Sequence, residues 1–79
     1  MSKHTLQILN EIFNEVFHDE SIFLDRETSS NDIEKWDSLN NMHLVVAIEK
    51  RFKLRVTLKD IRSWGNVGDV CDWIDIKIA

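Results

Sequence analysis

The sequence predicts a small all-α protein, a four-helix bundle with three longer helices and a short third helix. The 79 residues contain no proline and only two glycines, so few residues interrupt helix formation. Apolar residues recur at helical spacing in separate segments. The alternating segment 54–57 has no second strand-like run to pair with, so we expect an extended link there. The length allows one domain, residues 1–79, with a modest core.

The first expected helix covers residues 3–18, and a long polar loop follows it. The apolar stripe of this helix consists of Leu6, Leu9, Phe13, Val16 and Phe17, widened by Ile8 and Ile12. Residues 19–35 are mostly polar, and we expect isolated apolar residues to anchor them: Ile22, Phe23, Leu24 and Ile33. A loop of this length is unusual in so small a domain and is often functional.

The second expected helix covers residues 38–53 and follows the sequence WDSL at 36–39. Its core stripe consists of Leu44, Ile48 and Phe52, with Val45 beside it. Asp37 and Ser38 precede this stripe and suit the N-cap and the first turn of the helix.

Two shorter helices are expected after the link. Thr57 can cap residues 58–64, with Asp60 completing a capping box, and Gly65 is expected to end this third helix. Asn66 can then cap the last helix. The stripe of that helix consists of Val67, Val70, Cys71, Ile74 and Ile78.

The net charge of −4 is unevenly distributed. Residues 1–37 hold nine acidic and three basic side chains, whereas residues 38–79 hold five acidic and seven basic ones. Six bases fall within residues 50–62: Lys50, Arg51, Lys53, Arg55, Lys59 and Arg62. The acidic total and the lack of aromatic residues among these bases argue against nucleic-acid binding. The simplest interpretation is a solvated helix end whose cations complement the helix dipole.

Several kinds of catalytic or metal site are not favoured. Ser38 lacks a GxSxG turn, and His43 lies about 140° around the helix from it, so a serine hydrolase is not expected. No glycine-rich phosphate loop is present. The histidines are too far apart in sequence for a zinc site, and we expect them on the surface: His4, His18 and His43. Three carboxylates of the last helix are expected to form a solvated face: Asp69, Asp72 and Asp75.

Cys71, the single cysteine, excludes an internal disulfide and is expected to be buried and inert. No run of residues approaches the roughly 20 apolar residues of a membrane span, and the first residues do not form a secretory signal. We therefore expect a monomer in the cytoplasm without a membrane span.

Three segments together resemble the acyl carrier protein family: WDSL at 36–39, the following NNMHLVVAIEKRF, and VTLKDIRSWGNVGDVCDWI. The resemblance extends from about residue 5 to residue 76. In that family a phosphopantetheinyl transferase attaches 4′-phosphopantetheine from coenzyme A to the serine of DSL. The resemblance implies that Ser38 is the attachment site, that Asp37 supports the modification, and that the chain is a carrier and not an enzyme.

The resemblance also implies two surfaces around the serine. In the family this face of the second helix docks partner enzymes, here through Leu39, Met42, His43, Val46, Lys50 and Arg51. The alternative is that Leu39, Met42 and Val46 only widen the core. An acyl crevice is expected along the inner face, lined by Leu44, Ile48, Ile61, Trp64 and Val70.

The chain departs from the family in the charge of this helix. Asn40 and His43 stand where acids are typical, and Lys50 and Arg51 follow Glu49. We therefore expect a partner surface that is less basic, and a dedicated pathway leading to a polyketide, a peptide-like product, or a modified sugar or lipid. The expected partners are acyl-loading, condensing or transferring enzymes.

Two alternatives remain open. An aminoacyl or peptidyl carrier would share the bundle and the serine. An unmodified helical interaction module would use Ser38 only as a helix cap.

Overall fold

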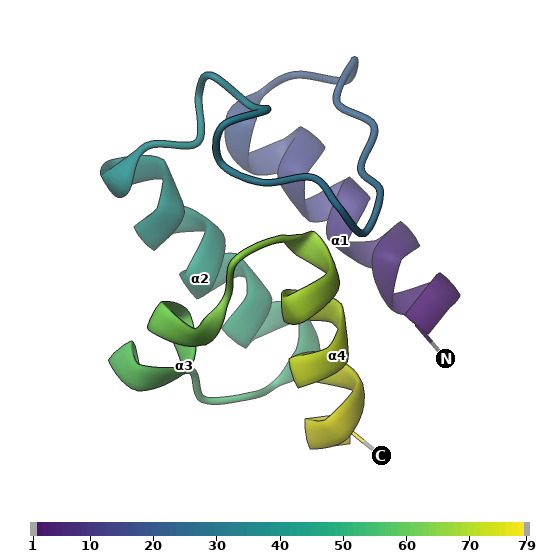
Figure 1. Cartoon of the computed structure of the whole chain (residues 1–79), viewed down its shortest axis with the longest axis vertical. Coiled ribbons are helices and arrows are strands. Elements are labelled where there is room, and N and C mark those ends of the chain that lie inside the picture. The colour runs from purple at the N-terminus through teal and green to yellow at the C-terminus, as the bar shows by residue number, and fades with distance from the viewer. Residues whose placement is uncertain (1, 79) are drawn as a thin grey trace.

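The protein folds as four helices without strands over residues 2–78, the part of the chain that the computed structural model describes (Figure 1). The helices are α1 (Ser2–Phe17), α2 (Ser38–Phe52), α3 (Leu58–Ser63) and α4 (Val67–Ile78). α1 packs against both α2 and α4. The short α3 lies beside α4, where the Trp64 and Trp73 rings meet edge to face. The predicted all-α fold class is confirmed.

The core consists largely of the apolar stripes predicted for the longer helices. The prediction for Ile78 is wrong, because this residue of the last turn of α4 is 52% exposed. The fully buried side chains with the largest volumes come from α1, α2 and α4: Phe13, Leu9, Ile48, Ile74, Val67 and Cys71. Phe13 meets Phe17 and Trp36 in edge-to-face contacts, with ring centroids 5.3 and 5.0 Å apart. Leu44 is buried with them, whereas Phe52 is only partly buried at the edge of the core.

The helix ends agree with the predicted caps, with small differences. α1 and α2 each end one residue earlier than expected, because His18 and Lys53 adopt positive φ angles of 52° and 56°. The Thr57–Asp60 capping box of α3 is present as predicted. Asn66 caps α4, since its Oδ1 accepts a hydrogen bond from the Asp69 N–H at 2.9 Å.

One predicted stop is wrong. α3 ends at Ser63, and its C-cap is Trp64 in an extended conformation, so Gly65 does not end the helix. Neither glycine has a positive φ angle.

The loop between α1 and α2 is held by two asparagines of α1. Asn10 accepts a hydrogen bond from the Leu24 N–H at 2.6 Å and donates to the Ile22 carbonyl at 3.0 Å. Asn14 donates to the carbonyls of Asp19 and Ile22 at 2.9 and 3.1 Å. Leu24 is buried as predicted, and Ile22 and Ile33 pack against the core. The prediction for Phe23 is wrong, because its side chain is 90% exposed.

The same loop is also bonded to the start of α4. The N–H groups of Val67 and Gly68 donate to the carbonyls of Thr28 and Arg26, both at 2.8 Å. Gly68 allows this approach, because a Cβ atom there would lie 2.9 Å from the Arg26 oxygen. The first unpaired N–H groups of α4 are thus satisfied by backbone from the loop.

Between residues 2 and 78, no helix combines the length and the apolar character that crossing a membrane requires.

Candidate functional site at the start of helix α2

Asp37 caps α2, and Ser38 is the first residue of that helix. The Asp37 carboxylate accepts a hydrogen bond from the Asn40 N–H at 2.9 Å, and the Asp37 carbonyl accepts one from the Asn41 N–H at 2.8 Å. The Asn40 side chain donates to the Lys35 carbonyl at 2.7 Å and holds the preceding chain against the helix. Because Asp37 supplies the cap, the first turn does not need Ser38 for that purpose.

The stripe that follows Ser38 is exposed. Leu39 is 69% exposed, Met42 55% and Val46 45%. These exposures rule out the alternative in which the three side chains only widen the core. An apolar row of this kind, beginning next to Ser38, is available to a partner surface.

The basic side chains expected on the same surface differ in their surroundings. Lys50, His43 and Val46 line a shallow depression of about 440 Å³ between α2 and the end of α1. Arg51 instead donates to Glu11 of α1, with 3.1 Å between Nη2 and Oε1, and both side chains remain about half exposed. Lys50 therefore continues the exposed stripe, whereas Arg51 is turned toward α1.

A cavity of about 410 Å³ lies beside the start of α2. Its lining comes from the loop, α2, α3 and the start of α4: Ser30, Trp36, Asp37, Asn41, Ile61, Trp64, Gly65, Asn66 and Val70. Three of the residues predicted for an acyl crevice, Ile61, Trp64 and Val70, are among them. The other two, Leu44 and Ile48, lie in the core and are not part of this lining.

The polar part of this lining was missed from the sequence. Trp36 donates from Nε1 to Asn41 Oδ1 at 2.9 Å, across a spacing of five residues that no regular pattern indicates. Asn66 was expected only as a helix cap. The one sequence feature that could have indicated this polar lining is the presence of Trp36 and Asn41 on either side of DSL.

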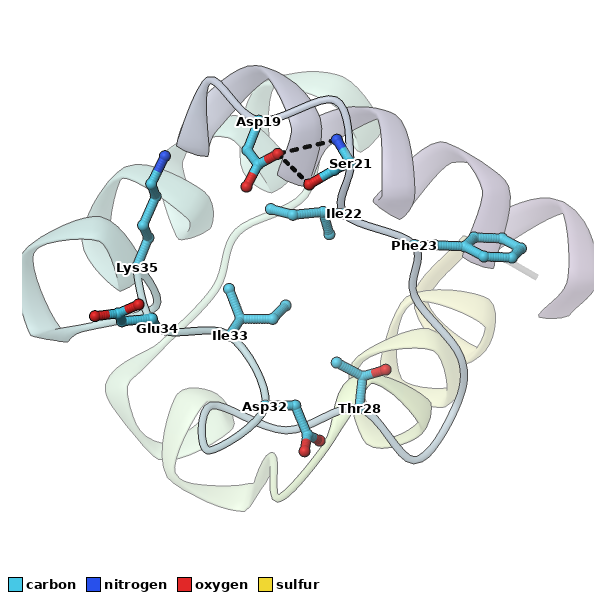
Figure 2. A pocket seen from close by; sticks show the side chains of 9 residues that line it. All are labelled: Asp19, Ser21, Ile22, Phe23, Thr28, Asp32, Ile33, Glu34 and Lys35. Carbon is cyan, nitrogen blue, oxygen red and sulfur yellow. Dashed lines mark hydrogen bonds between the residues drawn. The ribbon is translucent and has the colours of Figure 1, made fainter.

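A second cavity, of about 380 Å³, is enclosed by the α1–α2 loop (Figure 2). Ile22 and Ile33 point toward each other across it, whereas Phe23 points away. Asp19 accepts hydrogen bonds from the backbone and side chain of Ser21, and these bonds lower the pKa of its carboxyl group. This cavity shares no lining residue with the cavity that contains Asp37.

Most of the remaining candidate groups are placed as the sequence predicted, but Asp75 is not on the predicted solvated face, because it is only partly exposed and is bonded to the buried Thr5. Cys71 is fully buried, and burial raises the pKa of its thiol to about 11. His4, His18 and His43 are exposed. The three carboxylates of α4 have separate partners: Asp69 accepts from the Gly65 N–H, Asp72 pairs with Arg26, and Asp75 accepts from Thr5. Among residues 2–78 no three histidine, cysteine, aspartate or glutamate side chains come together as metal ligands.

Comparison with known proteins gives one family and one close structure. A family model described as a phosphopantetheine attachment site matches residues 7–74. The solution NMR structure of a holo acyl carrier protein from Geobacter metallireducens is 47% identical in sequence, with a TM-score of 0.89. That match covers 94% of this chain and 85% of the other. Comparison with curated protein sequences gives no match.

The fold, the exposed stripe after Ser38 and the adjacent cavity define a small helical carrier domain. The family model covers most of the chain, including the whole of α2 and α3. The chain therefore belongs to the phosphopantetheine-attachment family and is an acyl carrier protein, which bears 4′-phosphopantetheine as a covalent cofactor. The site fits such a group, because a helix N-terminus at an exposed turn favours a phosphate and leaves it open to solvent.

Proposed function

We propose that Ser38 carries the 4′-phosphopantetheine arm and that the chain works in the cytoplasm as a non-catalytic carrier of acyl thioesters. A phosphopantetheinyl transferase would join the Ser38 hydroxyl oxygen to the phosphorus of the pantetheine phosphate, releasing adenosine 3′,5′-bisphosphate from coenzyme A. The observation that carries this proposal is the family match across the start of α2, where Ser38 directly follows the capping residue Asp37.

The position of Ser38 supports this role physically. A phosphodiester attached at the first residue of α2 lies at the positive end of a helix of 15 residues. Asp37 is exposed beside it, and we propose that its carboxylate also assists the transferase. The helix cap would remain intact during modification, because the Asn40 N–H bonds to Asp37.

The thiol that carries the acyl group belongs to the arm. Cys71 cannot substitute for it, because the side chain is fully buried and its raised pKa keeps it protonated near neutral pH. Ile61, Trp64 and Val70 would contact an acyl chain that folds back into the cavity beside Asp37. Leu44 and Ile48 would form the apolar floor behind them.

Partner enzymes would dock on α2 through the exposed stripe that begins at Leu39. Met42 and Val46 extend the apolar row, and His43 and Lys50 lie along its edge. A flexible methionine in the middle of the row suits contact with several enzymes in turn. These enzymes would load, condense or transfer the acyl group.

Charge on the same surface supports a dedicated pathway. Lys50 stands in the last turn of α2 with Arg51, and the first turn of α2 contains no acid after the cap. A basic partner surface would therefore be attracted less strongly here than to an acidic helix. We expect the modified protein to be a poor substrate for fatty acid synthesis enzymes; elongation at the rate of their own carrier would contradict this.

The test of attachment is a change in mass. The apo protein is incubated with coenzyme A, magnesium and a broad-specificity transferase, and we expect a gain equal to one phosphopantetheine. Ser38→Ala should show no gain, whereas the matched control Ser30→Ala, beside the same cavity, should be modified normally. The native modified protein should also gain one alkylatable thiol, because Cys71 is buried.

The same experiment addresses the alternatives. No mass gain with several transferases would support an unmodified interaction module. A mass gain followed by loading with an amino acid by an adenylating enzyme would support an aminoacyl or peptidyl carrier.

A further inference from the structure

The cavity beside Asp37 contains two tryptophans whose N–H groups differ in one respect. Trp36 Nε1 donates to Asn41 Oδ1 at 2.9 Å. Trp64 Nε1 is buried, and within the described part of the chain it has no acceptor. Buried N–H groups are nearly always hydrogen-bonded, so an exception calls for an explanation.

Trp64 lies against a second indole ring and near several polar side chains that bond to other donors. Its ring meets Trp73 edge to face, with centroids 5.5 Å apart and an angle of 72° between the planes. Three of the polar side chains that share the cavity already accept hydrogen bonds from other donors. Asp37 accepts from the Asn40 N–H, Asn41 from Trp36, and Asn66 from the Asp69 N–H.

We propose that Trp64 Nε1 donates a hydrogen bond to an oxygen on the carried acyl chain, so that this carrier selects an oxygenated chain over a saturated one. The inference rests on the proposed attachment at Ser38, which follows a residue that lines the same cavity. A hydroxyl or keto oxygen close to the thioester is the chemical class that fits. Ile61 and Val70 supply the apolar contacts for the carbon atoms on either side of that oxygen.

The selectivity follows from the cost of an unsatisfied donor. Trp64 Nε1 is already shielded from water, so a chain whose own oxygen reaches it supplies the missing acceptor, whereas a chain with no oxygen beyond the thioester carbonyl leaves the donor unsatisfied at that point. A site with a buried donor discriminates against analogues that lack the acceptor. A bond to the pantetheine arm or to the thioester carbonyl, which are the same for every cargo, could not distinguish one cargo from another, so the selectivity requires an acceptor on the acyl chain itself.

The test compares three forms of the protein labelled with nitrogen-15. A transferase loads Ser38 with pantetheine alone, with a hexanoyl arm or with a 3-hydroxyhexanoyl arm, and the mass confirms loading in each case. The indole N–H resonance of Trp64 is then recorded, with those of Trp36 and Trp73 as internal references. We expect the Trp64 proton to move downfield only with the hydroxylated chain.

A second measurement uses the thioester itself. Hydrolysis of the 3-hydroxyhexanoyl thioester should be slower than that of the hexanoyl thioester by about fivefold, the factor that one net hydrogen bond of ordinary strength provides. Trp64→Phe keeps a ring and removes the donor, so this difference should disappear. Trp73→Phe, which removes the neighbouring indole N–H, should retain it.

The outcomes separate this inference from the attachment proposal. A failure to gain mass at Ser38 would contradict attachment, on which the inference depends. Two results with full loading would overturn only the selectivity. One is the same Trp64 indole resonance in all three forms, and the other is a downfield change that is already present with pantetheine alone. Circular dichroism of Trp64→Phe confirms that the variant is folded before its hydrolysis rate is interpreted.

Discussion

Gly68 lies at the contact between the α1–α2 loop and α4, and its missing side chain makes that contact possible. A Cβ atom would lie 2.9 Å from the backbone oxygen of Arg26, which cannot move without displacing the loop. We expect Gly68→Ala to lower the free energy of unfolding by about 1–3 kcal/mol, the usual cost of overpacking, reduced by the better helix propensity of alanine. Urea unfolding followed by circular dichroism measures this change.

The other glycine is a matched control for this prediction. A Cβ atom at Gly65 would meet only the end of the flexible Asp69 side chain, at 3.2 Å. Gly65→Ala should therefore leave stability nearly unchanged. Equal effects of the two substitutions would contradict the proposed close approach at Gly68.

Cys71 gives the protein a pH dependence at alkaline pH. Burial raises the pKa of its thiol to about 11, from an unfolded value near 9. The unfolded chain therefore releases this proton first, so the stabilising contribution is complete below pH 9 and is lost as the pH rises toward 11. We expect the urea midpoint to fall over this interval by more in the wild type than in Cys71→Ala, since only the wild type has this thiol, whereas the lysines that titrate in the same interval are present in both proteins. Parallel curves would contradict the shift.

Among the helices, α3 depends most on its cap, because it has six residues and none of them is buried. Thr57 and Asp60 bond reciprocally, and the bonds from Thr57 lower the pKa of the Asp60 carboxyl group. We expect Thr57→Ala to cost about 1 kcal/mol and to release α3 locally. Hydrogen exchange of the Ile61 and Trp64 amides should accelerate in this variant, whereas Lys59→Ala in the same helix should have little effect.

The pH dependence of the cap has the opposite direction from that of Cys71. Because the pKa of Asp60 is lowered in the folded protein, its carboxylate stabilises α3 above the unfolded value of 3.8. This stabilisation is lost as the pH falls below that value. If the protection of the α3 amides against hydrogen exchange did not change between pH 6 and pH 3, this role of Asp60 would be contradicted.

For the whole molecule, the uneven charge distribution predicts that acidic substitutions on α2 change which partner enzymes the carrier prefers. His43→Glu combined with Lys50→Glu places acids along the exposed edge of α2, and we expect faster reaction with fatty acid synthesis enzymes that have basic docking surfaces. The increase should be about tenfold at low salt and should vanish in high salt. Lys59→Glu combined with Arg62→Gln changes the net charge equally on α3 and should not reproduce the increase.

The sequence predicted those parts of the molecule that depend on local pattern. The stripes of α1 and α2, the stripe of α4 up to Ile74, the Thr57–Asp60 box and the Asn66 cap all follow from spacing along one segment. The contact of Arg26 and Thr28 with α4 could not be predicted, because backbone bonds between distant segments leave no periodic signal. The exposure of Phe23 was missed for a related reason, since nothing nearby in the sequence shows which loop residues face the core.

The candidate site was predictable to a similar extent. The motif around Ser38 and the exposed row from Leu39 follow from the sequence, as do the cavity residues Ile61 and Trp64. The polar wall of the cavity and the unpaired Trp64 N–H depend on the relative placement of three helices. That placement is a property of the folded protein.

The beginning of α1 and the end of α4 lie away from the start of α2. Thr5 near the beginning of α1 donates to Asp75 near the end of α4, which joins the first and last helices at one end of the molecule. In Figure 1 the first turn of α1 and the last turn of α4 appear toward the right, whereas α2 begins at the left. Immobilising the protein on a surface, or fusing it to a second domain through either end, would therefore leave the serine-bearing turn directed outward and accessible to large enzymes.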